Sequence, residues 1–218
     1  MSRLKLLTAC ALLAALPVIG AEPEPRLQEA VGAYERGEFP RAAAAFGRLS
    51  AEGVAAADYN LAVMHLRREL PRASDAQGVS LMTRAADAGF VTAMVAMAEL
   101  HELGRAGLPV DLRRSVLWLR RAAEAGSVDA RVDLATAYYL GRGAARDPAL
   151  AARWYRLAAQ GGDVGAMYLY ASMLETGDGV GRDLAEARYW YAAAARQGDL
   201  AAPGKVREID DRLARPAS

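Results

Sequence analysis

Small apolar residues recur along most of the chain at a nearly constant interval. Each of four consecutive segments opens with a glycine, places alanines four and nine residues later, and closes on an alanine pair. The opening glycines are Gly53, Gly89, Gly126 and Gly162, and Gly198 marks where a fifth segment would start. Their spacings of 36, 37, 36 and 36 residues are typical of a solenoid, in which copies of one structural unit stack on each other.

Within each segment the apolar positions follow a helical period. In the third segment one stripe at i, i+4, i+7 and i+8 predicts the buried face of a first helix. A second helix presents a matching stripe. The two stripes are Ala130, Leu134, Ala137 and Tyr138, and then Ala151, Trp154, Tyr155 and Ala158.

The loop between the two stripes carries the expected helix-end signals. Gly141 can adopt the left-handed conformation that ends a first helix. Asp147 is predicted to cap the second helix, with Pro148 at its first helical position. Asp111 and Asp183 hold the same cap position in their segments. Each segment is therefore predicted to be a helix–turn–helix pair.

The predicted organisation has four parts. Residues 1–21 form a signal peptide and residues 22–52 an N-terminal helical hairpin. Residues 53–197 contain four repeats, and residues 198–218 form a C-terminal capping helix and tail, which an array needs to cover its last apolar face. The capping helix is predicted to be polar and to run from Lys205 to Leu213, with Val206, Ile209 and Leu213 on one face. The four repeats are predicted at 53–88, 89–125, 126–161 and 162–197.

The first 21 residues have the pattern of a secretory signal. Arg3 and Lys5 precede an apolar run that is too short to span a bilayer, and cleavage is expected after Gly20 or Ala21. This predicts a periplasmic or secreted protein that is not integral to the membrane once cleaved. An uncleaved anchor is one alternative. A lipoprotein is another, and it is less favoured because Cys10 lies inside the apolar run instead of after it.

Charge and cysteine content narrow the function classes. Removal of the leader leaves 25 basic against 26 acidic residues, so no basic balance favours nucleic acid as a partner. Cys10 is the only cysteine, so a mature chain that begins after Ala21 has no disulfide framework.

The repeat resembles the Sel1-like repeat, a relative of the tetratricopeptide repeat, across residues 53–197. In the third repeat the resemblance rests on Ala130, Leu134, Ala135, Tyr138, Gly141, Gly143, Asp147, Trp154, Tyr155, Ala158, Ala159 and Gly162. The resemblance implies an all-α fold, a right-handed α/α superhelical solenoid. It also implies a protein-binding scaffold, and some bacterial members of this family are periplasmic. Residues 27–52 look more like a lone tetratricopeptide-type hairpin.

No catalytic or metal site is predicted, and no cofactor. His65 and His101 are 36 residues apart, so they occupy one repeated packing position and lack the ligand count of a closed metal site. Trp118, Trp154 and Trp190 recur at the same interval and are interpreted as packing residues. The alternative is an envelope enzyme or metal-binding protein that uses the two histidines and acidic neighbours.

Partner binding is predicted where the repeats differ. In tetratricopeptide arrays the first helix of each pair lines the concave groove, and three positions of that helix vary here from repeat to repeat. Tyrosines at these positions are expected to anchor a protein or peptide partner, with glutamates on the same face. The alternative is that some of these tyrosines only pack between repeats. A peptidoglycan or glycan ligand of the same groove remains open. The predicted partner-binding residues are Tyr59, Glu99, Glu102, Val132, Thr136, Tyr139, Tyr168, Ser172 and Glu175; the same positions also hold Val63, Leu66 and Val95.

Overall fold

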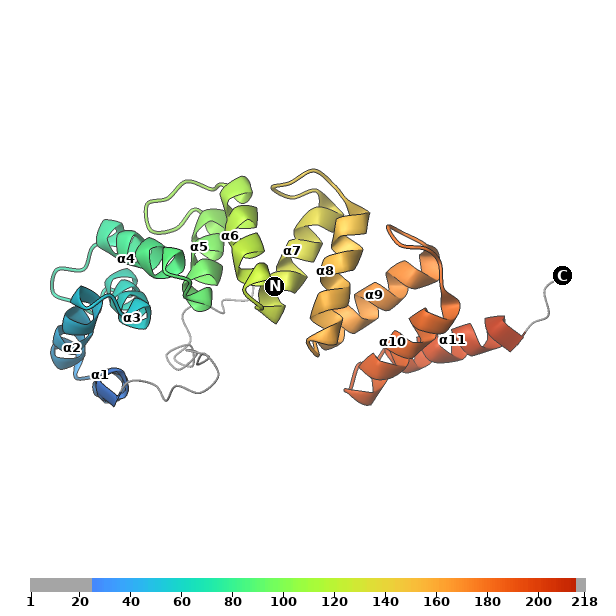
Figure 1. Ribbon diagram of the computed structural model, residues 1–218, viewed down its shortest axis with the longest axis horizontal. Coiled ribbons are helices and arrows are strands. Elements are labelled where there is room, and N and C mark those ends of the chain that lie inside the picture. Colours follow the sequence, from blue (N-terminus) through green and yellow to red (C-terminus); the bar gives the residue numbers. More distant parts are fainter. Residues whose placement is uncertain (1–24, 215–218) are drawn as a thin grey trace. The chain divides into compact units, whose positions relative to one another are not determined.

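The computed structural model describes residues 25–214, which form helices joined by short loops and turns (Figure 1). The predicted signal peptide, residues 1–21, lies outside the described residues. The helices are α1 (Pro25–Glu35), α2 (Phe39–Ala51), α3 (Ala55–Leu66), α4 (Asp75–Asp87), α5 (Val91–Leu103), α6 (Leu112–Glu124), α7 (Val128–Leu140), α8 (Pro148–Gln160), α9 (Val164–Thr176), α10 (Leu184–Arg196) and α11 (Ala202–Ala214).

The chain divides into two compact units, at the boundary between Trp118 and Leu119 within α6. In the first unit each helix from α1 to α5 packs on the next one in sequence. Its N-terminal hairpin is tied to the first repeat by a shared core, in which Phe46 of α2 and Met64 of α3 are fully buried.

The second unit repeats this arrangement from α7 to α11, with consecutive helices in contact. The predicted stripe of α7 is confirmed, since Ala130 and Leu134 are fully buried and Tyr138 nearly so. On α8, Tyr155 is buried as predicted, whereas Trp154 is only half-buried.

The left-handed turn after each first helix occupies one position in all four repeats. Gly104, Gly141 and Gly177 hold it with φ between 62° and 78°, as the sequence predicts. In the first repeat Arg68 takes the same position with φ 60°. A residue with a Cβ is strained in this conformation. The Arg68 guanidinium forms an exposed ion pair with Asp75 at 2.8 Å.

The predicted N-caps are confirmed. The Asp147 carboxylate accepts from the Leu150 N–H at 2.9 Å, with Pro148 in the first turn of α8. Asp183 and Asp111 accept in the same way at the starts of α10 and α6. These caps satisfy backbone donors that have no partner inside the helix.

The last helix differs from its prediction in two respects. α11 begins at Ala202, earlier than expected, because Pro203 is tolerated in a first helical turn. Ile209 is fully buried, but Leu213, expected on the same face, is 50% exposed. The cap therefore buries little apolar surface of its own.

Candidate partner-binding face

The variable positions of the first helices do not share one environment. Tyr59 on α3 is only 2% exposed, and its ring packs against Phe90 with centroids 5.3 Å apart. Burial raises the pKa of its phenol, and the smaller effects of Arg67, which lowers the pKa, and of Glu99, which raises it, oppose each other. Val63, one turn further on, is also buried. The α3 positions therefore serve the core between repeats, the alternative role that the sequence leaves open.

On α5 the three variable positions are partly exposed. Val95, Glu99 and Glu102 are each half-buried, one and two turns apart along the helix. In the first unit this is where acidic side chains reach the surface of a first helix.

On α7, Tyr139 is held by residues from two loops. The Arg146 guanidinium lies over its ring, 5.6 Å from the centroid, and donates from Nε to the Tyr139 carbonyl at 3.1 Å. The Tyr139 hydroxyl is hydrogen-bonded to Asp178, which raises the pKa of the phenol. Arg146 also pairs with Asp178 at 3.8 Å. The ring is thus fixed in orientation while staying partly exposed.

Half-buried Thr136 lies one turn before Tyr139. Its hydroxyl lies 2.8 Å from that of Tyr155 on α8 and donates to the carbonyl of Val132, 2.9 Å away. Thr136 therefore connects the variable face of α7 to the buried stripe of α8. Val132 is half-buried on the same face.

On α9 the variable residues meet the last two helices. The Tyr168 ring packs edge-on against Tyr191 of α10, with centroids 5.0 Å apart. The Tyr191 hydroxyl donates to Glu175 Oε2 at 3.0 Å. Burial raises the pKa of the Tyr191 phenol, and the bond to Glu175 raises it further. Ser172, half-buried between the two, is also hydrogen-bonded to Tyr191.

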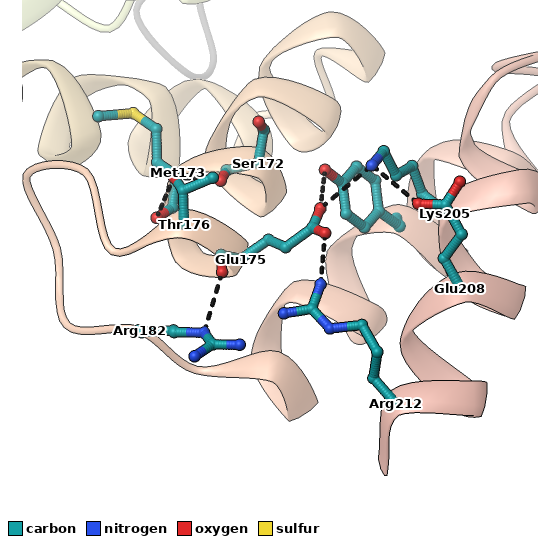
Figure 2. Close-up of polar contacts among 9 residues, drawn as sticks. Ser172, Met173, Glu175, Thr176, Arg182, Lys205, Glu208 and Arg212 are labelled. Carbon is teal, nitrogen blue, oxygen red and sulfur yellow. Dashed lines mark hydrogen bonds and ion pairs between the residues drawn. The ribbon is translucent and has the colours of Figure 1, made fainter. Parts of the chain in front are cut away.

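The Glu175 carboxylate is the centre of this cluster (Figure 2). Arg212 of α11 donates to Oε1 at 2.7 Å, and the Lys205 ammonium lies 3.6 Å from Oε2. Only 12% of the Glu175 side chain is exposed. One carboxylate therefore joins α9, α10 and α11 through a hydroxyl and two cations.

Sequence reasoning missed Lys205 and Arg212. Both lie in the predicted capping helix, and each lies one residue beyond an equivalent variable position, because the 36-residue register leads from Tyr168 to Gly204 and from Glu175 to Asp211. Continuing the repeat register into α11 would therefore have found neither residue. The partly exposed variable residues of the second unit are thus Val132, Thr136, Tyr139, Tyr168 and Ser172, with Glu175 more enclosed.

The histidines do not form a metal centre with other ligands in the described part of the chain. No group of three His, Cys, Asp or Glu side chains there could hold an ion. The His65 Nδ1 accepts a hydrogen bond from the Ser74 N–H at 3.2 Å, and His101 is 3% exposed. Trp190 is half-buried and donates to Glu186 at 3.2 Å, consistent with packing.

Helix pairs that stack at an interval of 36 or 37 residues define the described chain as an all-α solenoid, and this confirms the predicted fold class. The family model of the Sel1 repeat matches residues 55–90, 91–127, 128–163 and 164–199, more than half of the chain. The chain therefore belongs to the Sel1 repeat family, as its resemblance to Sel1-like repeats indicates.

Solved structures of bacterial proteins share the fold. A protective antigen present in uropathogenic Escherichia coli strains, with an SLR fold, is 27% identical with a TM-score of 0.72. The match covers 82% of this chain and 38% of the antigen. A Sel1 repeat protein from Oxalobacter formigenes is 30% identical with a TM-score of 0.69, over 78% of this chain and 49% of its own. The chain thus spans less than half of either protein. A search of curated proteins finds no match.

The family defines a general role. Sel1 repeats generally mediate protein–protein interactions and are generally non-catalytic scaffolds. None of the helices described between residues 25 and 214 is long and apolar enough to cross a membrane.

Proposed function

We propose that this chain is a non-catalytic scaffold of the bacterial periplasm, which binds a partner protein or peptide through the first helices of its repeats. The observation that carries this proposal is the contrast between two sets of positions. Almost all of the alanines that recur in register are buried, whereas Val132, Thr136, Tyr139, Tyr168 and Ser172 differ from repeat to repeat and stay partly exposed.

Two tyrosines are the proposed anchors in the second unit. Arg146 and Asp178 orient the ring of Tyr139, and Tyr191 orients that of Tyr168. An aromatic ring that is fixed before binding loses little conformational entropy on binding, which favours its use as an anchor. Glu99 and Glu102 are proposed to contact the partner in the first unit, where α5 carries them at equivalent positions.

The test is capture of the partner by purified variants. Tyr139→Ala combined with Tyr168→Ala should weaken capture more than tenfold, since truncation of an aromatic hot spot costs about 2 kcal/mol or more. Tyr189→Ala is the matched control, because Tyr189 is an exposed tyrosine on a second helix, with 58% of its surface accessible. Circular dichroism should show all variants helical.

Full binding by the double variant would contradict the proposed face. Loss of binding by Tyr189→Ala alone would place the partner on the second helices. Retention of the wild-type chain by isolated peptidoglycan, lost in the double variant, would indicate a glycan ligand instead of a protein.

A further inference from the structure

One position of the first helices carries histidine in the first unit only. It lies eight residues after the first alanine of each repeat and is occupied by His65, His101, Tyr138 and Leu174 in turn. Both histidines of the chain therefore lie in the first unit, and the second unit has none.

The residue at this position accepts a hydrogen bond from the capping residue of the following helix. In three repeats the N–H of the capping residue donates to the backbone carbonyl at the position: Asp111 to His101 at 2.8 Å, Asp147 to Tyr138 at 2.9 Å and Asp183 to Leu174 at 3.0 Å. In the first repeat the capping residue is Ser74, and its N–H donates to the His65 imidazole instead, at Nδ1. A side chain that takes up protons thus replaces a carbonyl that does not.

The hydrogen bond requires an unprotonated Nδ1. Protonation turns this acceptor into a donor that faces the Ser74 N–H, at the cap of α4. Burial already lowers the pKa of His65 below its ordinary value of 6.5. Around the α3–α4 connection, Arg68 pairs with Asp75 and Arg67 pairs with Glu69, and Arg72 is the remaining charged residue there. Further along α4, Arg84 pairs with Asp58 of α3.

His101 disfavours protonation for a related reason. Only 3% of it is exposed, and its Nδ1 receives no hydrogen bond from the described residues. Burial is the main cause that lowers its pKa. The guanidinium of Arg114, at the start of α6, adds to this, while the Asp111 carboxylate opposes it.

We infer that the first unit is an acid-sensitive half of the chain, which loosens at the α3–α4 connection and around His101 as the histidines take up protons, while the second unit does not respond. The sign follows from the two states of each histidine. The unfolded chain binds protons at the ordinary histidine pKa, and the folded chain binds them at lower pH. The free energy of unfolding of the first unit therefore has its full value above about pH 6.5, where the histidines are neutral in both states, and it falls as the pH drops below that value. The inference does not depend on what the chain binds.

Hydrogen exchange of the full chain tests it. Amide protection, corrected for intrinsic exchange, should fall several-fold in α3, α4 and α5 between about pH 7.5 and about pH 5.5, a range in which ordinary carboxyl groups stay ionised. Protection in α8, α9 and α10 should stay unchanged. An equal fall in both units, or no fall in the first, would overturn the inference.

The matched variant is His65→Asn with His101→Leu. Asparagine offers an acceptor oxygen near the place of Nδ1, and leucine is the residue that α9 carries at this position. The double variant should keep its protection across the same pH range, and a fall equal to that of the wild type would also overturn the inference. Should the double variant fail to fold, NMR titration of the two wild-type imidazoles decides, since a folded-state pKa at or above 6.5 for both would contradict it.

Discussion

Gly179 lies directly against the backbone of Pro148, at the first turn of α8. A Cβ at position 179 would overlap the Pro148 carbonyl group and come within 2.7 Å of its Cβ, and φ at Gly179 is +75°. The loop of the fourth repeat therefore reaches the start of the second helix of the third repeat by a contact that only glycine permits.

Gly179→Ala should destabilise the second unit by about 3 kcal/mol, through backbone strain together with overpacking. Gly162→Ala is the control from the same unit. Its φ is also positive, at +93°, but an added Cβ would meet nothing within 4 Å. It should cost only about 1 kcal/mol. Amide hydrogen exchange in α8 and α10 measures the loss of stability in both variants. Equal losses in Gly179→Ala and Gly162→Ala would show that the contact with Pro148 contributes nothing.

The buried carboxylate of Asp58 gives the second prediction. The Arg84 guanidinium donates to both of its oxygens and also to the Ser50 hydroxyl at 2.6 Å, so it joins α2, α3 and α4. Asp58 is 2% exposed, whereas 57% of the Arg84 side chain is exposed.

Replacing Arg84 and replacing Asp58 should therefore lower the free energy of unfolding by different amounts. Arg84→Met leaves a buried charge without compensation and should cost about 3 kcal/mol in the free energy of unfolding of the first unit. Asp58→Asn should cost less, because Arg84 can turn to solvent. The free energies of unfolding of the two variants can be compared by urea unfolding monitored by hydrogen exchange in the first unit. A larger loss of stability in Asp58→Asn than in Arg84→Met would contradict the prediction.

The contacts of Glu175 are expected to keep α11 packed against α9 and α10. Glu175→Ala leaves Lys205, Arg212 and the Tyr191 hydroxyl without their shared acceptor, and α11 buries little apolar surface to compensate. We expect amide protection in α11 to fall by about 2 kcal/mol, the scale of hydrogen bonds to a charged group. Arg188→Ala removes the exposed pair of α10 with Asp210 and should have little effect. A similar loss in both variants would show that the enclosed carboxylate is not the main tie.

The leader prediction has a direct chemical test. The mature N-terminus should be Ala21 or Glu22, read by N-terminal sequencing of protein from the periplasmic fraction. Cys10→Ser should leave processing unchanged. A lipoprotein would behave in the opposite way, with processing lost in Cys10→Ser.

Much of the fold follows from the sequence because the repeat supplies four aligned copies of each position. The cap at Asp147 and the buried stripe of α7 could be predicted for this reason, since each has a local cause that recurs. Side-chain contacts between repeats could not. Neither the burial of Tyr59 against Phe90 nor the hold of α11 on Glu175 has a local signal, because each depends on which residue a neighbouring helix presents.

The claim that the first helices form the binding face is tested most directly by photo-crosslinking in cells. A photoreactive amino acid at Val132 or Ser172 samples first helices, and one at Arg153 or Tyr189 samples exposed positions of second helices. We predict that one partner protein crosslinks from Val132 and Ser172, with little product from Arg153 and Tyr189. Crosslinks to that partner from the second helices alone would contradict the account.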